Sequence, residues 1–282
     1  MKFIFRKTVL LMLLFISQMT LAQDKMLNIS VAGGVEILKY TPEIGEPKPG
    51  GSVMIECQFQ QFLTNNFGYG VGVDISYLTA NYYISETIET PITDETDAGI
   101  PYTLRTIFDD FNEKQRSFLV EAPIGLYARV PSKYIHFIVG AGVKVGLPIV
   151  AKYDYSRGTV ETRAYFGDDI DAELSKIPHH GLYKQGTNAG DIDINRLQLS
   201  LYADIMWRFI FNDASPLHLG AYFSYGLNDM VSNHDATMGI HKNSILNSTL
   251  TDKIVPICIG LKIGLAIPFE KGGKRSIFDG FR

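Results

Sequence analysis

The strongest constraint on the fold is a strict alternation of apolar and polar side chains that returns along the 282-residue chain. In "SFLVEAPIGLYARV", residues 117–130, every second residue from Phe118 to Val130 is apolar, whereas Glu121 and Arg129 fall on the opposite side. Successive side chains of a β-strand point to opposite faces of the sheet. The segment therefore predicts a strand with one apolar and one polar face.

The same alternation recurs in seven further segments. Each is about as long as the roughly 9–11 residues that a tilted membrane strand requires, or longer. The predicted strands cover residues 27–38, 51–60, 67–78, 117–130, 136–150, 196–209, 217–228 and 255–269. Such a series indicates that sheet dominates the chain.

The connections between these strands alternate in length. Three are tight and rich in Asn, Asp, Ser and Pro, as turns are, and they cover residues 63–66, 131–134 and 211–216. The other four cover residues 39–50, about 84–115, about 154–194 and about 230–253. Short turns that alternate with long loops are typical of outer-membrane barrels. A water-soluble sandwich or lipocalin-like barrel gives no reason for this sorting.

We therefore predict an all-β fold, an eight-stranded antiparallel up-and-down transmembrane β-barrel in the cell outer membrane. Lipid tolerates no unpaired sheet edge, so the barrel must be closed. In this layout both termini lie in the periplasm and the long loops are extracellular.

The N-terminus predicts a cleaved signal peptide over residues 1–22. Basic residues are followed by the apolar stretch 9–16 and by Thr-Leu-Ala at positions 20–22. The alternative, a transmembrane anchor, would need about 20 apolar residues. The predicted organisation is thus a signal peptide, a barrel over residues 23–269 and a periplasmic C-terminal tail over residues 270–282.

Charge and cysteine placement restrict the function further. Removal of residues 1–22, which hold three cations and no acid, lowers the formal net charge from −4 to −7. An acidic exported chain is not expected to bind nucleic acid. Cys57 falls on the lipid face and Cys258 on the lumen face, so we expect two free thiols rather than a disulfide.

The predicted lumen carries equal numbers of acids and bases. They are Glu36, Glu56, Asp74, Glu121 and Asp204 with Arg129, Lys144, Arg196, Arg208 and Lys262. Eight strands enclose a space that side chains just fill, and an unpaired ion there costs several kcal/mol. We predict an internal ion network and no permanent pore; the alternative is a narrow channel for small solutes.

Candidate metal ligands fall in the long loops. They are His179, His180, His234 and His241, with Asp168, Asp169, Asp171 and Glu173 near the first pair. The stretch "DIDIN", residues 191–195, imitates the start of a calcium loop but lacks its glycine and its closing glutamate. Solvated polar loops are the favoured interpretation, so no metal or cofactor is predicted. Acidic loops could still bind Ca²⁺ loosely or engage the cations that bridge lipopolysaccharide.

A catalytic alternative rests on Ser232 and His234. Some eight-stranded barrels are lipid A deacylases or acyltransferases that use Ser and His at the membrane rim, and a Ser–His pair is the minimum for nucleophilic catalysis. Near neighbours at the start of a loop rarely reach a productive geometry. We therefore predict a non-enzymatic protein.

Two segments are candidates for binding a partner. Leu104, Ile107, Phe108 and Phe111 have the spacing of a short amphipathic helix, which would pack over the barrel or on a partner; an internal loop core is the favoured alternative. The tail is basic and has apolar anchors, so it is either an unstructured end or a docking peptide. Its candidate docking residues are Lys274, Arg275, Ile277, Phe278 and Phe281.

"SFLVEAPIGLYARV" followed by "HFIVGAGVKVGLPI" resembles the middle hairpin of the PorT-like outer-membrane β-barrel family. "LHLGAYFSYGLNDM" and the last strand, closing on Phe269, resemble the final hairpin of that family and of small OmpA/OmpX-type barrels. The resemblance covers roughly residues 26–269, and the residues after Phe269 depart from it. It implies a Gram-negative cell-envelope protein, a scaffold or the membrane subunit of a secretion or assembly complex. The implied partners are outer-membrane lipid or lipopolysaccharide and an envelope protein complex.

Overall fold

The computed structural model describes most of the predicted barrel. The described residues are 24–40, 44–92, 102–166, 173–174, 182–184, 189–211, 215–236 and 243–269. The predicted signal peptide and the predicted tail, with Lys274, Arg275, Ile277, Phe278 and Phe281, lie outside them.

The described strands form one 13-stranded sheet with antiparallel ladders. Their bounds are β1 Asp24–Lys39, β2 Glu46–Lys48, β3 Gly50–Phe62, β4 Phe67–Ile84, β5 Thr87–Ile92, β6 Tyr102–Val130, β7 Ile135–Tyr165, β8 Glu173–Leu174, β9 Leu182–Lys184, β10 Ala189–Asp191, β11 Gln198–Phe209, β12 Leu217–Gly226 and β13 Val255–Pro268. One short 3₁₀ helix, η1, covers Ile245–Asn247. Among the described residues, no helix is both long and apolar enough to cross a membrane.

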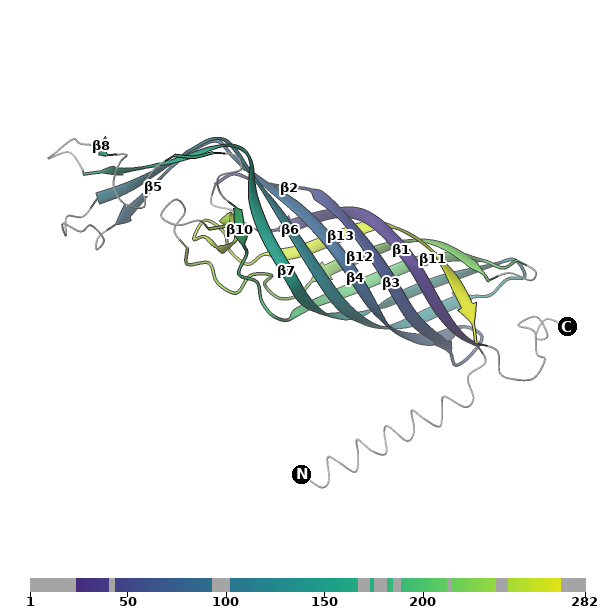
Figure 1. Ribbon diagram of the computed structural model, residues 1–282. Coiled ribbons are helices and arrows are strands. Elements are labelled where there is room, and N and C mark those ends of the chain that lie inside the picture. The colour runs from purple at the N-terminus through teal and green to yellow at the C-terminus, as the bar shows by residue number, and fades with distance from the viewer. Residues whose placement is uncertain are drawn as a thin grey trace, which may run out of the picture.

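The long strands close into a ring. The order of pairing is β1-β3-β4-β6-β7-β11-β12-β13, and β13 pairs again with β1. Figure 1 shows these strands inclined around one axis. The expected antiparallel barrel is therefore observed, and it leaves the ring no free edge.

The two ends of the barrel differ. One end, here the turn end, holds the short connections at 63–66 and 131–134, and the first and last described strands meet there, where Phe269 N donates to Lys25 O (2.9 Å). The other end, here the loop end, carries the long connections and the short strands β2, β5, β8, β9 and β10. Figure 1 shows how far the loop end extends.

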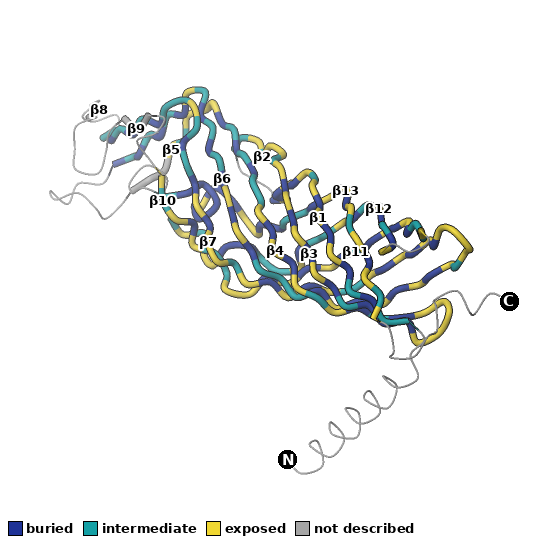
Figure 2. The backbone as a smooth tube through the Cα atoms, turned by 45° about the vertical axis from the view of Figure 1, so that its right-hand side comes forward, coloured by how far each residue is buried: buried dark blue, intermediate teal, exposed yellow. Residues whose placement is uncertain are grey.

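Side chains alternate between the lumen and the outer surface as the sequence predicts. Phe118, Ile124 and Leu126 are exposed, while Arg129 is buried and Glu121 lines an internal cavity. Figure 2 shows exposed and buried residues alternating along the strands. The opening segment is thus apolar toward the outside and charged toward the lumen.

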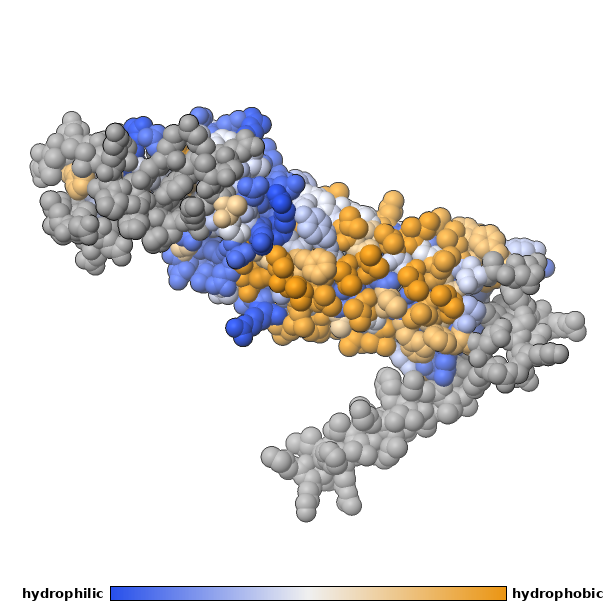
Figure 3. Space-filling view, in the orientation of Figure 1, coloured by the Kyte–Doolittle hydropathy of each residue, from blue (hydrophilic) through white to orange (hydrophobic). Residues whose placement is uncertain are grey.

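The outer surface of the barrel is an apolar band (Figure 3). Exposed Val, Ile and Leu side chains contributed by every strand of the ring form it, and Leu126, for example, is 74% exposed. Exposed aromatic side chains lie near the turn end (Phe67, Tyr134, Trp207, Phe211 and Phe269) and also farther along the strands (Tyr77, Phe118 and Phe223). A monomeric water-soluble protein rarely exposes so large an apolar surface, whereas lipid favours it.

Strands β6 and β7 are longer than the sequence predicts. Their ladder continues beyond the band to Tyr165, and β5, β8 and β9 join them there. We call this extension, made of β5 and of residues 102–109 and 159–165 with β8 and β9, the arm. Figure 1 shows the arm bending away from the barrel. Much of the predicted 84–115 and 154–194 loops is therefore paired sheet.

The candidate short helix at Leu104–Phe111 is not formed: the segment lies in strand β6, and Leu104, Phe108 and Phe111 are core residues, in line with the favoured alternative of an internal core. Leu104 and Phe108 lie on the buried face of β6, and Phe111 is also buried, although it has the opposite parity. A β-bulge at Asp109–Asn112, where Asp110 has φ +49°, shifts the register and exchanges the two faces. Because of the bulge, the buried residues Leu104, Phe108 and Phe111 are four and three positions apart in the sequence. These spacings are also typical of one face of a helix.

Candidate functional site

Lys144 on β7 is the centre of one ion cluster in the lumen. Its Nζ lies 2.7 Å from Asp74 Oδ2 and 3.7 Å from Glu121 Oε2. Asp74 comes from β4 and Glu121 from β6, so the cluster joins three neighbouring strands. Asp74 and Lys144 are buried, which makes the pairing necessary for both.

Lys262 on β13 is the centre of a second cluster. Its Nζ lies 2.9 Å from Asp204 Oδ1 and 3.3 Å from Glu56 Oε2, and Ser30 Oγ donates to Glu56 Oε1 at 3.0 Å. Glu56 on β3 and Asp204 on β11 lie on opposite sides of the ring. Lys262 therefore links opposite walls and fills the lumen between them.

Near the turn end the lumen holds cations that have mostly neutral partners. Arg208 is fully buried and donates to Asn28 Oδ1 (3.0 Å) and Gln60 Oε1 (2.9 Å). It lies opposite His136 on β7 and His218 on β12 in the ladders. The alternation places both histidines in the lumen, but a count of charges alone overlooks them.

Arg129 finds a carboxylate that the sequence prediction missed. Its Nη1 lies 2.8 Å from Asp24 Oδ2, and its guanidinium stacks over the Phe62 ring at 4.1 Å. The predicted first strand begins at Leu27, but β1 begins at Asp24, and Asp24, Met26 and Asn28 all lie on its lumen face. Extending the pattern backwards places Asp24 on the lumen face.

Two predicted members of the ion network lie outside these pairs. Arg196 is exposed and precedes β11, which begins at Gln198, so its predicted place in the lumen is wrong. Asn195 Nδ2 donates to the carbonyls of Asp229 and Val231, and this takes the chain out of the strand just before Arg196. Glu36 is buried as predicted, but neither carboxylate oxygen has a hydrogen-bond partner among the described residues.

The described residues between 227 and 254, here the cap, fold back over the loop end. Apolar cap residues pack with the extended strands into one buried cluster. Its cap members are Met230, Val231, Ile245, Leu246, Leu250 and Ile254, and its strand members include Leu38, Tyr82, Phe108, Phe111 and Tyr153. This apolar core lies above the ion clusters and closes the lumen at the loop end.

Glu113 on β6 holds the cap. Its carboxylate accepts hydrogen bonds from Ser244 Oγ (2.6 Å), Ile245 N (3.0 Å) and Gln115 Nε2 (3.0 Å). It lies beyond Phe118, the last exposed apolar residue of β6 on this side, and is fully buried. Burial raises the pKa of Glu113 to about 7, although these three donors favour the ionised form.

The calcium-like stretch supports the cap instead of forming a loop of its own. Asp193 O accepts from Ser232 N (3.1 Å) and Asn247 Nδ2 (2.9 Å). The part of the chain that the structure describes contains no group of three or more His, Cys, Asp or Glu side chains able to hold a metal. Asp168, Asp169, Asp171, His179, His180 and His241 lie outside the described residues, and Glu173 begins β8.

The proposed rim nucleophile and base have other partners. His234 Nε2 lies 2.8 Å from Asp229 Oδ2, and its Nδ1 lies 3.2 Å from Thr251 Oγ1. Ser232 Oγ donates to Asp193 O at 3.3 Å. Both residues therefore tie the cap together.

Cys57 and Cys258 are free thiols, on the outer surface and in the lumen respectively, as predicted.

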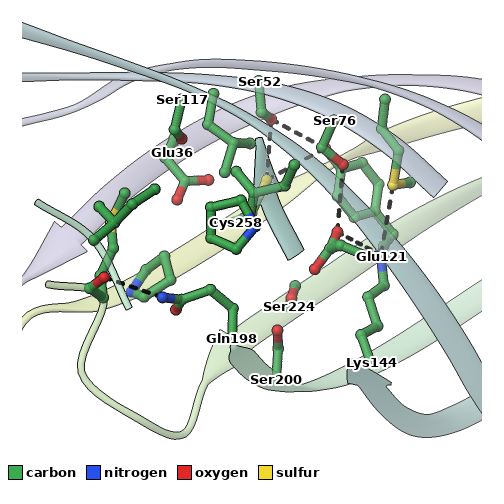
Figure 4. Close-up of a pocket in the computed structure, with 18 residues that line it drawn as sticks. Glu36, Ser52, Ser76, Ser117, Glu121, Lys144, Gln198, Ser200, Ser224 and Cys258 are labelled. Carbon is green, nitrogen blue, oxygen red and sulfur yellow. Dashed lines mark hydrogen bonds and ion pairs between the residues drawn. The ribbon is translucent and has the colours of Figure 1, made fainter. Parts of the chain in front are cut away.

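An internal cavity of about 50 Å³ lies below the cap. Glu36, Glu121 and Lys144 line its sides, while Ile194 and Met230 lie toward the loop end. Figure 4 shows Glu36 and Ser117 on one side of this space and Ser200 and Ser224 across from them. A volume of this size holds a few water molecules or a small ion.

Comparison with known proteins identifies the family. The sequence profile described as "Outer membrane protein beta-barrel domain" matches residues 17–232. No curated protein matches the chain.

Solved structures give only a distant likeness. Ail, the attachment invasion locus protein of Yersinia pestis, is 11% identical with a TM-score of 0.32, and the match covers 87% of this chain and 99% of that chain. Neisserial surface protein A is 7% identical with a TM-score of 0.31, over 84% of this chain and 96% of that chain. The profile match covers most of the chain: this protein belongs to the outer-membrane β-barrel domain family and is an outer-membrane protein.

Proposed function

We propose that this protein is a closed, non-enzymatic barrel that serves as an envelope scaffold or as the membrane subunit of a secretion or assembly complex. The observation that carries the proposal is the arm. It continues the β6–β7 ladder far beyond the apolar band, at the end where the cap closes the lumen. The folded surface that a partner protein could bind therefore lies outside the membrane and not along a pore.

The charged lumen supports a structural role. Lys144 and Lys262 each pair with two carboxylates across the interior. A solute that crossed would have to separate these buried pairs and displace the apolar core of the cap. The barrel thus acts as a rigid anchor for the arm.

The orientation follows from the layout of outer-membrane barrels. We place the turn end and both termini in the periplasm, and the arm and cap on the cell surface. The apolar band contacts outer-membrane lipid, and the loop end faces lipopolysaccharide. The resemblance to PorT-like barrels, whose members include accessory proteins of envelope secretion, agrees with this assignment.

The test is affinity purification from native membranes in mild detergent. Three forms are compared: the whole protein, a variant in which residues 87–107 and 159–188 are each replaced by a short Gly-Ser linker, and a variant that ends at Phe269. Because the arm is an extension, the arm variant keeps the ring, the ion clusters and the cap segment, and it removes only Val160 and the partly buried Ile88 from the apolar cluster under the cap.

We expect an envelope protein in stoichiometric amount with the whole protein and at least a tenfold loss from the arm variant. Loss from the tail variant instead would move the docking site to the periplasm. If no stoichiometric partner is recovered with the whole protein, the scaffold assignment is wrong. Lipid A from a deletion strain, analysed by mass spectrometry, should keep its acyl number.

A further inference from the structure

The cavity below the cap contains a carboxyl group that pairs with no cation of the described chain. Glu36 is 1% exposed and lines the cavity, and both of its oxygens are without a hydrogen-bond partner among the described residues. Its neighbour across the ladder is the neutral thiol of Cys258, whose Sγ also lies within hydrogen-bond distance of Ser52 Oγ (3.0 Å) and Tyr222 Oη (3.3 Å). An isolated buried carboxylate is very unfavourable in a protein interior.

The cations of the lumen are committed elsewhere. Lys144 serves Asp74 and Glu121, and Lys262 serves Glu56 and Asp204. Two ammonium groups thus face four carboxylates before Glu36 is counted. Glu36 is the carboxyl group of this set that has no ion pair with either ammonium.

The cavity offers oxygen donors around Glu36. The hydroxyls of Ser117, Ser200 and Ser224 line it, and none of the three bonds to another described residue. Carboxylate, hydroxyl and water oxygens are the ligands of hard cations. About 50 Å³ admits a small ion with a few waters.

We propose that this cavity binds one monovalent hard cation of the sodium class, held by the Glu36 carboxylate and by the free serine hydroxyls directly or through water. A single positive charge neutralises the single unpaired carboxylate. The ion lies at the junction of barrel and cap, because Ile194 and Met230 enclose the same cavity.

The test uses linkage between ion binding and unfolding. The full-length mature protein in detergent is unfolded with urea at 1 and 200 mM NaCl, with choline chloride keeping the ionic strength constant. An ion that binds only the folded state lowers the unfolding constant by about tenfold at ten times its dissociation constant. We expect such a decrease in the whole protein and in the surface control Glu46→Gln, and none in Glu36→Gln.

A second measurement does not depend on the variants. Crystals grown with RbCl should give one anomalous peak in the cavity beside Glu36. No peak there, or a sodium dependence equal in the wild type and Glu36→Gln, would overturn the proposal and leave Glu36 as a neutral acid among waters.

Discussion

Lys262 shows at the residue level why the lumen charges occur as groups. Its ammonium is enclosed and touches both Asp204 and Glu56. Replacing it with methionine, Lys262→Met, leaves two buried carboxylates without their cation. We expect a loss of about 3–5 kcal/mol in the free energy of unfolding, measured with urea in detergent micelles.

The matched control for Lys262→Met is Arg116→Met, which removes an exposed ion pair with Asp154 at 3.3 Å. An exposed pair contributes about 0–1 kcal/mol, so Arg116→Met should lose little unfolding free energy. Equal losses in the two variants would contradict the view that burial makes the Lys262 cluster important.

The burial of Glu113 under the cap predicts that the free energy of unfolding depends on pH. Its pKa rises from 4.5 to about 7 on burial, so the folded protein holds more protons than the unfolded chain between these pH values. The free energy of unfolding should therefore fall as the pH rises from about 4.5 to about 7. The urea midpoint should be lower at pH 8 than at pH 5.

Other buried groups also titrate, so the readout for Glu113 is a difference between proteins. In Glu113→Gln, whose amide does not ionise, the decrease between pH 5 and pH 8 should be smaller than in the wild type. A decrease of the same size in both would show that Glu113 is not the group responsible.

At the level of the strands, glycines in the lumen make room for large side chains. A Cβ on Gly140 would overlap the ring of Tyr127, and that ring is fixed because Gln58 Nε2 donates to Tyr127 Oη at 2.7 Å. Gly140→Ala should therefore cost about 1–3 kcal/mol in unfolding free energy. On the lipid side, a Cβ on Gly33 meets only Ser52 O at 3.8 Å, and Gly33→Ala should stay within about 0.5 kcal/mol. Urea unfolding of the two variants tests this, and a larger loss for Gly33→Ala would contradict it.

The strands also show what limits prediction from sequence. The faces of residues 117–130 follow from alternation, because lipid outside and charge inside impose it along the whole ladder. At Asp110 the bulge exchanges the faces, and Gly158 opposite has φ +76° and approaches the Asp110 carbonyl too closely for any Cβ. Neither residue type predicts a bulge from sequence, so the alternation identifies only residues 117–130 of β6 as a strand and leaves the earlier part as a loop.

For the whole molecule, the sequence predicts which residues face inward but not which of them meet. Glu56 and Lys262 are 206 residues apart, and they become neighbours only when the ring closes. Arg196 follows the alternation of β11 yet lies outside it, because tertiary hydrogen bonds of Asn195 hold this part of the chain away from the strand, which begins only at Gln198. The cap is not predicted from the sequence either, because its apolar residues are scattered through a segment without periodicity.

The position of the molecule in the bilayer can be tested at two heights of one strand. Ile124 is 53% exposed and pairs with Val71 and Val143, both within the band, whereas Val130 ends β6 at the turn end. A lysine at the bilayer midplane costs about 2–4 kcal/mol and one near the interface about 0–1 kcal/mol. In phospholipid vesicles, Ile124→Lys should therefore lose far more unfolding free energy than Val130→Lys. Equal losses would mean that the band does not span the bilayer, because only the depth of the charge distinguishes these two lipid-facing positions.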